Sequence, residues 1–65
     1  MKPPKYKYED LVMFRYGGDT LTGVIYIVDA YGTLEQNKEP SYDIYNEQNN
    51  TLYKHIRESD VFKIG

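Results

Sequence analysis

A chain of 65 residues has room for one domain, and a domain of this length buries only about 60% of the surface that its unfolded form exposes. Apolar residues make up 40% and charged residues 28% of the chain, values typical of a folded domain rather than a disordered segment. The absence of cysteine excludes disulfides and thiolate chemistry, and the net charge of −2 argues against a strongly basic nucleic-acid-binding domain.

The sequence also carries information on location. No run of 18 apolar residues is present, so no membrane-spanning helix is predicted. The segment from Met1 to Lys5 has no apolar stretch behind its charges, so an export signal is not expected. Together with the lack of cysteine, this pattern predicts a soluble cytoplasmic protein with no membrane partner.

The first eight residues differ in composition from the rest of the chain. Lysines at positions 2, 5 and 7 surround Pro3 and Pro4, and the prolines disfavour both helix and sheet hydrogen bonding. We therefore expect a flexible basic N-terminal arm over residues 1–8, followed by one domain over residues 9–65.

The domain begins with a predicted hairpin. Residues 10–16 alternate, with Val12 and Phe14 on one face, which predicts a strand. Gly17 and Gly18 follow, and glycine permits the positive φ of a tight turn. Residues 20–31 are rich in β-branched and aromatic side chains, and residues 24–28 are apolar on both faces. This run predicts a long strand buried on both sides, with Ile25 and Ile27 in the core.

The second half of the chain predicts a loop, another hairpin and a short closing strand. Residues 32–40 are mostly polar and favour a loop. Residues 41–46 alternate, with Tyr42 and Ile44 opposite Asp43 and Tyr45, and the polar residues 47–50 favour a turn. The returning strand over residues 51–56 is predicted to place Leu52, Lys54 and Ile56 on one face. Residues 57–60 suit one 3₁₀ turn before a last strand over residues 61–64.

The elements in this order predict an all-β fold. Short strands without helical spacers favour a barrel or a sandwich, and a closed barrel removes exposed sheet edges in a small domain. The layout of residues 10–64, with a 3₁₀ turn between the fourth and fifth strands, resembles the five-stranded SH3-like barrel.

Three segments carry a narrower resemblance: residues 23–29 (GVIYIVD), residues 41–44 (SYDI) and residues 53–60 (YKHIRESD). They are similar to small uncharacterised SH3-like barrel proteins of Gram-positive bacteria, phages and mobile elements, a group that implies no particular activity. The start of the long strand, Thr22-Gly23-Val24, also resembles KOW-type barrels, which implies contact with RNA, ribosomes or polymerase.

Catalytic and metal-binding patterns are not found. His55 is the only histidine, and it stands near Glu58 and Asp60 in the sequence. General acid–base catalysis also needs a second reacting group in a pocket, and structural zinc sites need four ligands. The sequence therefore predicts a protein that is not an enzyme and has no cofactor and no metal.

The chain contains eight tyrosines but only two phenylalanines and no tryptophan. Tyrosine either covers a thin core with its hydroxyl in water or supplies rigid contact area in a binding face. The second interpretation predicts a protein-binding or assembly module. Its candidate contact residues are Tyr26, Tyr31, Tyr42, Tyr45 and Tyr53.

The distribution of charged residues along the chain indicates which class of partner to expect. Residues 17–50 contain six acidic residues and one basic residue, for a local charge of −5, which repels phosphate. An unidentified protein is therefore the expected partner, and the chain itself is expected to be a monomer or a weak homodimer. The alternative is a nucleic-acid or ribosome-associated accessory protein, which would use terminal basic residues such as Lys5, Lys7, Arg15, Lys54 and Arg57.

Overall fold

A computed structural model describes residues 3–31 and 39–64 of the chain, and in these residues the fold is all-β. The elements are β1 (Leu11–Tyr16), β2 (Asp19–Asp29), β3 (Ser41–Asn46), β4 (Thr51–Arg57), a 3₁₀ turn (Glu58–Asp60) and β5 (Val61–Lys63). Within the described ranges, no helix is long and apolar enough to cross a membrane. The expected loop over residues 32–40 falls mainly on residues 32–38, which lie outside the described residues.

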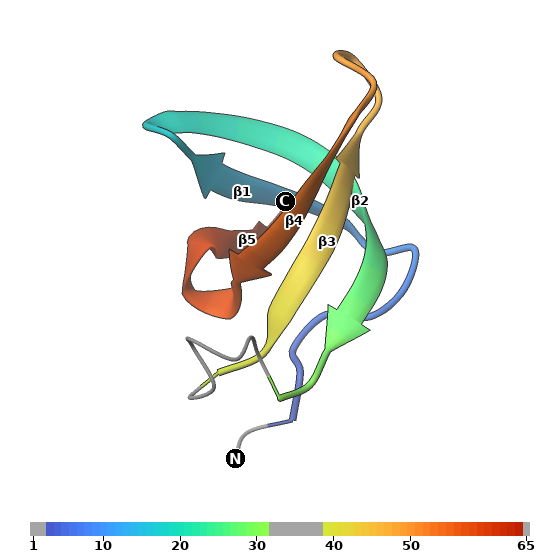
Figure 1. The fold of residues 1–65 in the computed structure, drawn as a ribbon, viewed down its shortest axis with the longest axis vertical. Coiled ribbons are helices and arrows are strands. Elements are labelled where there is room, and N and C mark those ends of the chain that lie inside the picture. The colour runs from blue at the N-terminus through green and yellow to red at the C-terminus, as the bar shows by residue number, and fades with distance from the viewer. Residues whose placement is uncertain (1–2, 32–38, 65) are drawn as a thin grey trace.

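All five strands belong to one antiparallel sheet, in the order β4-β3-β2-β1-β5. The long strand β2 pairs with β1 along its first half and with β3 along its second half. Figure 1 shows that β2 is strongly curved, so that the sheet wraps around its own inner side. In the described part of the chain β4 and β5 are the two edges, and the sheet does not close into a barrel.

The core lies on this inner side. Its buried apolar residues are Val12, Phe14, Ile25, Tyr42, Ile44, Ile56 and Val61. The predicted alternation is confirmed in β1, where Val12 and Phe14 are buried, and in β3, where Tyr42 and Ile44 are buried. The glycine turn is also confirmed, since φ is +57° at Gly17 and +87° at Gly18.

A β-bulge in β2 contradicts the prediction that this strand is buried on both sides. Ile25 pairs with Ile44 and Ile27 pairs with Asp43, so Tyr26 is an extra residue in the ladder. A bulge reverses the alternation of side chains beyond it. Ile25 is fully buried, but Ile27 is 54% exposed, and the prediction that Ile27 lies in the core is wrong.

A second bulge, in β4, contradicts the predicted faces of that strand. Ile44 pairs with Tyr53 and Tyr42 pairs with Ile56, which leaves one extra residue between the two pairs on β4. His55 has φ +59°, a left-handed backbone, and its amide donates to Asp43 Oδ1 at 3.0 Å. Tyr53 and Ile56 therefore both pack at the core, whereas the regular alternation predicted them on opposite faces.

Candidate functional site

The outer face of the sheet, opposite the core, carries apolar side chains in one line across four strands. Leu11 of β1 pairs with Val24 of β2, Val24 pairs with Tyr45 of β3, and Tyr45 pairs with Leu52 of β4. Side chains paired in this way lie about 5 Å apart on the same face of a sheet. The outer face of a single sheet is usually polar, so this line is a concentration of apolar side chains on the solvent side.

Two further residues of β2 enlarge this surface, and the second of them, Ile27, does so because of the bulge. Tyr26 is 49% exposed and stacks on Tyr45, with ring centroids 5.4 Å apart and an angle of 25° between the rings. Ile27, the next residue, is also turned outward. We call the resulting surface the outer patch, and it consists of Leu11, Val24, Tyr26, Ile27, Tyr45 and Leu52.

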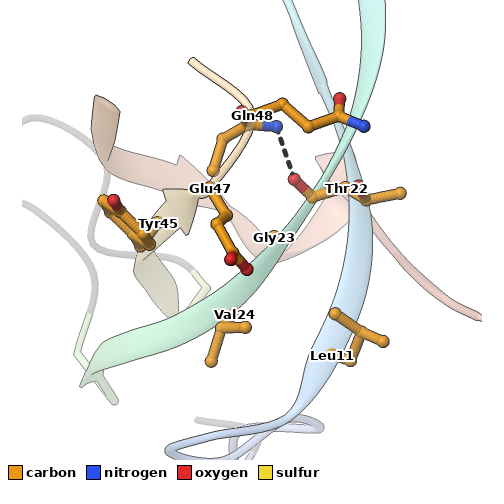
Figure 2. Close-up of a pocket in the computed structure, with 8 residues that line it drawn as sticks. Leu11, Thr22, Gly23, Val24, Tyr45, Glu47 and Gln48 are labelled. Carbon is orange, nitrogen blue, oxygen red and sulfur yellow. Dashed lines mark hydrogen bonds between the residues drawn. The ribbon is translucent and has the colours of Figure 1, made fainter. Parts of the chain in front are cut away.

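A hollow of about 440 Å³ lies at one end of the outer patch. It is lined by Leu11, Thr22, Gly23, Val24, Tyr45, Asn46, Glu47 and Gln48. Figure 2 shows the Glu47 side chain extending from the β3–β4 turn towards Val24, with Tyr45 on one side and Leu11 across the hollow.

Asn46 holds the turn above this hollow in position. Its Nδ2 donates to the carbonyl oxygen of Thr22 at 2.7 Å, and its Oδ1 accepts from the amide of Asn49 at 2.9 Å. The first bond ties the turn to β2 and the second closes the turn itself. A buried side chain therefore fixes the backbone of the turn that carries Glu47 and Gln48.

The structure brings only two of the five predicted contact tyrosines together. Tyr26 and Tyr45 form the stacked pair of the outer patch. Tyr31 is 72% exposed but lies beyond the end of β2. Tyr53 packs on the inner side against Phe14. Tyr42 is 1% exposed, so it belongs to the core and cannot contact a partner as predicted.

The inner side of β3 also holds a polar cluster, which we call the clasp and which consists of Lys5, Tyr6, Tyr42 and Glu58. The Tyr42 hydroxyl donates to Glu58 Oε2 at 2.8 Å and accepts from the Tyr6 amide at 3.3 Å. The Lys5 amide donates to the same Glu58 oxygen at 3.0 Å. Burial raises the pKa of Tyr42 far above its ordinary value, so this phenol stays protonated and donates.

The clasp fixes part of the N-terminal segment that the sequence predicts to be a flexible arm. Tyr6 packs edge-on against Tyr42, with ring centroids 5.6 Å apart, and its hydroxyl donates to the carbonyl oxygen of Val61 at 3.2 Å. The chain that follows also pairs with β2, since the Glu9 amide donates to the carbonyl of Ile25 at 2.8 Å. Residues 5–9 therefore contact the sheet at several points.

The basic residues proposed for nucleic-acid binding are partly engaged within the chain. Arg57 Nη2 lies 3.1 Å and Arg15 Nε lies 3.8 Å from the carboxylate of Asp60. Arg15 also stands over the ring of Phe62, 4.8 Å from its centroid. In residues 3–31 and 39–64, no three side chains of His, Asp or Glu are grouped as metal ligands.

Sequence reasoning identified Tyr26 and Tyr45 but missed the other members of the outer patch. The sequence did contain a signal for two of them. Val12, Phe14 and Ile25 face the core, so alternation turns their neighbours Leu11 and Val24 to the outer face, and both of these are apolar.

Comparison of the chain with models of protein families, with curated proteins and with solved structures finds no match.

Proposed function

We propose that this protein is a non-catalytic protein-binding or assembly module whose contact surface is the outer patch. The observation that carries the proposal is the apolar line from Leu11 through Val24 and Tyr45 to Leu52, in register across four strands. Apolar side chains gathered on the solvent side of a small domain are typical of surfaces that a partner covers. Aromatic residues at the centre of such a surface supply much of its binding energy.

The composition of the patch also supports a protein partner. Leu11, Tyr26 and Ile27 are each about half exposed or more, so a partner can bury them without any rearrangement of the core. Burial of apolar surface is favourable by about 25 cal/mol per Å². The stacked pair of Tyr26 and Tyr45 adds a rigid aromatic surface that loses little entropy on binding.

We also propose that the fold is of the SH3-like barrel type, and that the chain is related to the small uncharacterised proteins of Gram-positive bacteria, phages and mobile elements that its sequence resembles. The support for the fold is the curved β2 shared by two halves of the sheet, the pairing of β5 with β1, and the 3₁₀ turn before β5. The lack of cysteine supports a cytoplasmic location for such a protein.

Selection from a random peptide library tests the proposed function directly. We expect peptides enriched on the wild-type protein to lose at least about tenfold in affinity for a Leu11→Ser/Tyr26→Ser double variant, because both side chains are exposed and supply contact area. Tyr31→Ser is the control, because Tyr31 is even more exposed than Leu11 and Tyr26 but lies outside the patch. Amide spectra of the three proteins should show the same fold.

Two outcomes would contradict the proposal. The first is enrichment of peptides whose affinity the double variant leaves unchanged, which would place the contact surface elsewhere. The second is a set of saturable shifts at Lys5, Lys7, Arg15, Lys54 or Arg57 when oligonucleotides are added at low salt, with affinity falling steeply as salt rises. That second result would favour the nucleic-acid alternative, since counterion release produces this salt dependence.

A further inference from the structure

The hollow beside Tyr45 combines three kinds of surface that recognise one kind of side chain. Leu11 and Val24 supply apolar walls, the Tyr45 ring supplies an aromatic face, and the Glu47 carboxylate supplies a negative charge. Lysine and arginine have the matching chemistry, because each carries an apolar stem that ends in a cation. Cations bind both to carboxylates and to aromatic faces.

We propose that this hollow receives a lysine or arginine side chain from an extended, basic and apolar segment of the partner protein. The inference rests on the proposed function and narrows it to one class of partner. The alkyl stem packs on top of Leu11 and Val24, and the charged end lies between Glu47 and the Tyr45 ring. Apolar neighbours in the partner segment cover the rest of the outer patch, including Tyr26 and Ile27.

The charge distribution supports a cationic occupant. Within the described part of the chain, Glu47 makes no ion pair and no side-chain hydrogen bond, whereas both ion pairs found there use Asp60. The other carboxylates around the patch have the same sign: Asp10 precedes Leu11 in the sequence, and Asp43 pairs with Ile27.

The same geometry disfavours the other classes of occupant. A phosphate or an acidic side chain in the hollow would be repelled by Glu47. A purely apolar side chain would cover the Glu47 carboxylate without giving it a partner, which costs free energy. A basic side chain is the occupant that satisfies the carboxylate and the apolar walls together.

Three synthetic peptides test this inference. The first alternates leucine and arginine over five residues with both ends blocked, and the other two replace arginine by glutamine or by glutamate. Each is titrated into the full ¹⁵N-labelled chain at low salt. We expect the arginine peptide to bind about five- to tenfold more tightly than the glutamine peptide, with shifts at Leu11, Val24 and Glu47, and the glutamate peptide to bind more weakly than both.

Two variants separate the local effect of Glu47 from the overall charge. Glu47→Gln should bring the arginine and glutamine peptides to equal affinity. Asp19→Asn changes the net charge by the same amount, but Asp19 lies in the β1–β2 hairpin, paired with Tyr16. This control should keep most of the preference for arginine, since a distant surface charge is largely screened. Loss of the preference in both variants would overturn the inference, because it would show a general electrostatic effect.

The remaining outcomes also decide the question. Equal binding of the arginine and glutamine peptides at the outer patch would overturn the preference for a basic side chain and leave the proposed function standing. Absence of shifts with all three peptides would overturn the inference, and the library selection would then judge the proposed function separately. A concentration-dependent dimer in sedimentation that the Leu11→Ser/Tyr26→Ser variant abolishes would identify a second copy of this chain as the occupant, which also overturns the inference.

Discussion

Strand β3 carries a tyrosine towards each end, and each tyrosine lies near a glutamate, but the two pairs have opposite environments. Tyr42 and Glu58 are buried in the clasp, where the carboxylate accepts from the Tyr42 hydroxyl and from the Lys5 amide. Tyr45 and Glu47 line the hollow of the outer patch. There the Tyr45 hydroxyl bonds to Asn50, and Glu47 has no partner among the residues that the structure describes.

The difference shows that the same residue types are paired within the chain on one face of the sheet and exposed on the other. Tyr42 and Tyr45 are three residues apart on a regularly alternating strand, so their side chains point to opposite faces. On the inner face the chain itself satisfies the polar atoms, as burial requires. On the outer face the Glu47 carboxylate is exposed to solvent, which satisfies it without a partner from the described part of the chain.

The largest expected effect comes from truncating the two tyrosines. Tyr42→Ala should lower the free energy of unfolding by about 3–5 kcal/mol, because it leaves a cavity in the core. Tyr45→Ala should cost about 1 kcal/mol, since it loses mainly the stack on Tyr26. Urea unfolding measures both values, and an unfolded Tyr42→Ala protein counts as a large loss. Equal losses for the two variants would contradict the assignment of Tyr45 to the surface.

A second pair of variants tests the bulge that turns part of β2 outward. Ile25→Ala should cost about 2–5 kcal/mol, because Ile25 is fully buried. Ile27→Ala should cost less than about 1 kcal/mol, because Ile27 is on the solvent side of the bulge. Urea unfolding of the two variants gives the comparison. If Ile27→Ala costs as much as Ile25→Ala, the bulge at Tyr26 is misplaced and Ile27 does not belong to the outer patch.

The two glutamates provide a third comparison, of smaller size. Glu58→Ala should lower stability by about 1–3 kcal/mol, because the Tyr42 hydroxyl and the Lys5 amide both lose their acceptor. Hydrogen exchange at the Lys5 and Tyr6 amides should become faster in the same variant, because the clasp opens. Glu47→Ala should change stability by no more than about 0.5 kcal/mol. Unchanged amide exchange in Glu58→Ala would show that the clasp does not hold the N-terminal segment.

The last expected effect is a pH dependence at the alkaline side. Burial, followed by the hydrogen bond to Glu58, raises the pKa of Tyr42 above its ordinary value of 10.0. Since the folded state holds the phenolic proton more tightly, the stabilising contribution is complete below about pH 10 and is lost as the pH rises towards the folded-state pKa. We expect the wild-type stability to fall more steeply above pH 10 than that of Tyr42→Phe, by up to about 1.4 kcal/mol per pH unit.

Unfolding monitored by circular dichroism over this pH range makes the measurement. Tyr31→Phe is the control, because it removes an exposed tyrosine and should keep the wild-type slope. Parallel slopes for wild type and Tyr42→Phe would show that the Tyr42 phenol does not keep its proton more tightly in the folded state than in the unfolded chain.

The sequence alone determined the strands, the turns and which residues share a face in β1 and β3. Alternation placed Val12 with Phe14 and Tyr42 with Ile44, and the structure confirms both pairs, although the inward direction of Tyr42 was not predicted. Gly17 and Gly18 predicted the first turn because few other residues adopt positive φ easily. The 3₁₀ turn before the last strand is also confirmed, over Glu58–Asp60. These features depend on local preferences and on a period of two, both of which are visible in a single chain.

Only the tertiary structure decided which side chains form a surface. The bulges in β2 and β4 changed the faces of Ile27, which lies outward, and of Tyr53, which lies inward. A bulge forms through the pairing of two strands, so the sequence of one strand alone does not reveal it. The burial of Glu58 required Tyr42 and Lys5, which lie 16 and 53 residues away in the sequence. The outer patch has the same origin, because its line of apolar residues exists only after four strands have taken their register.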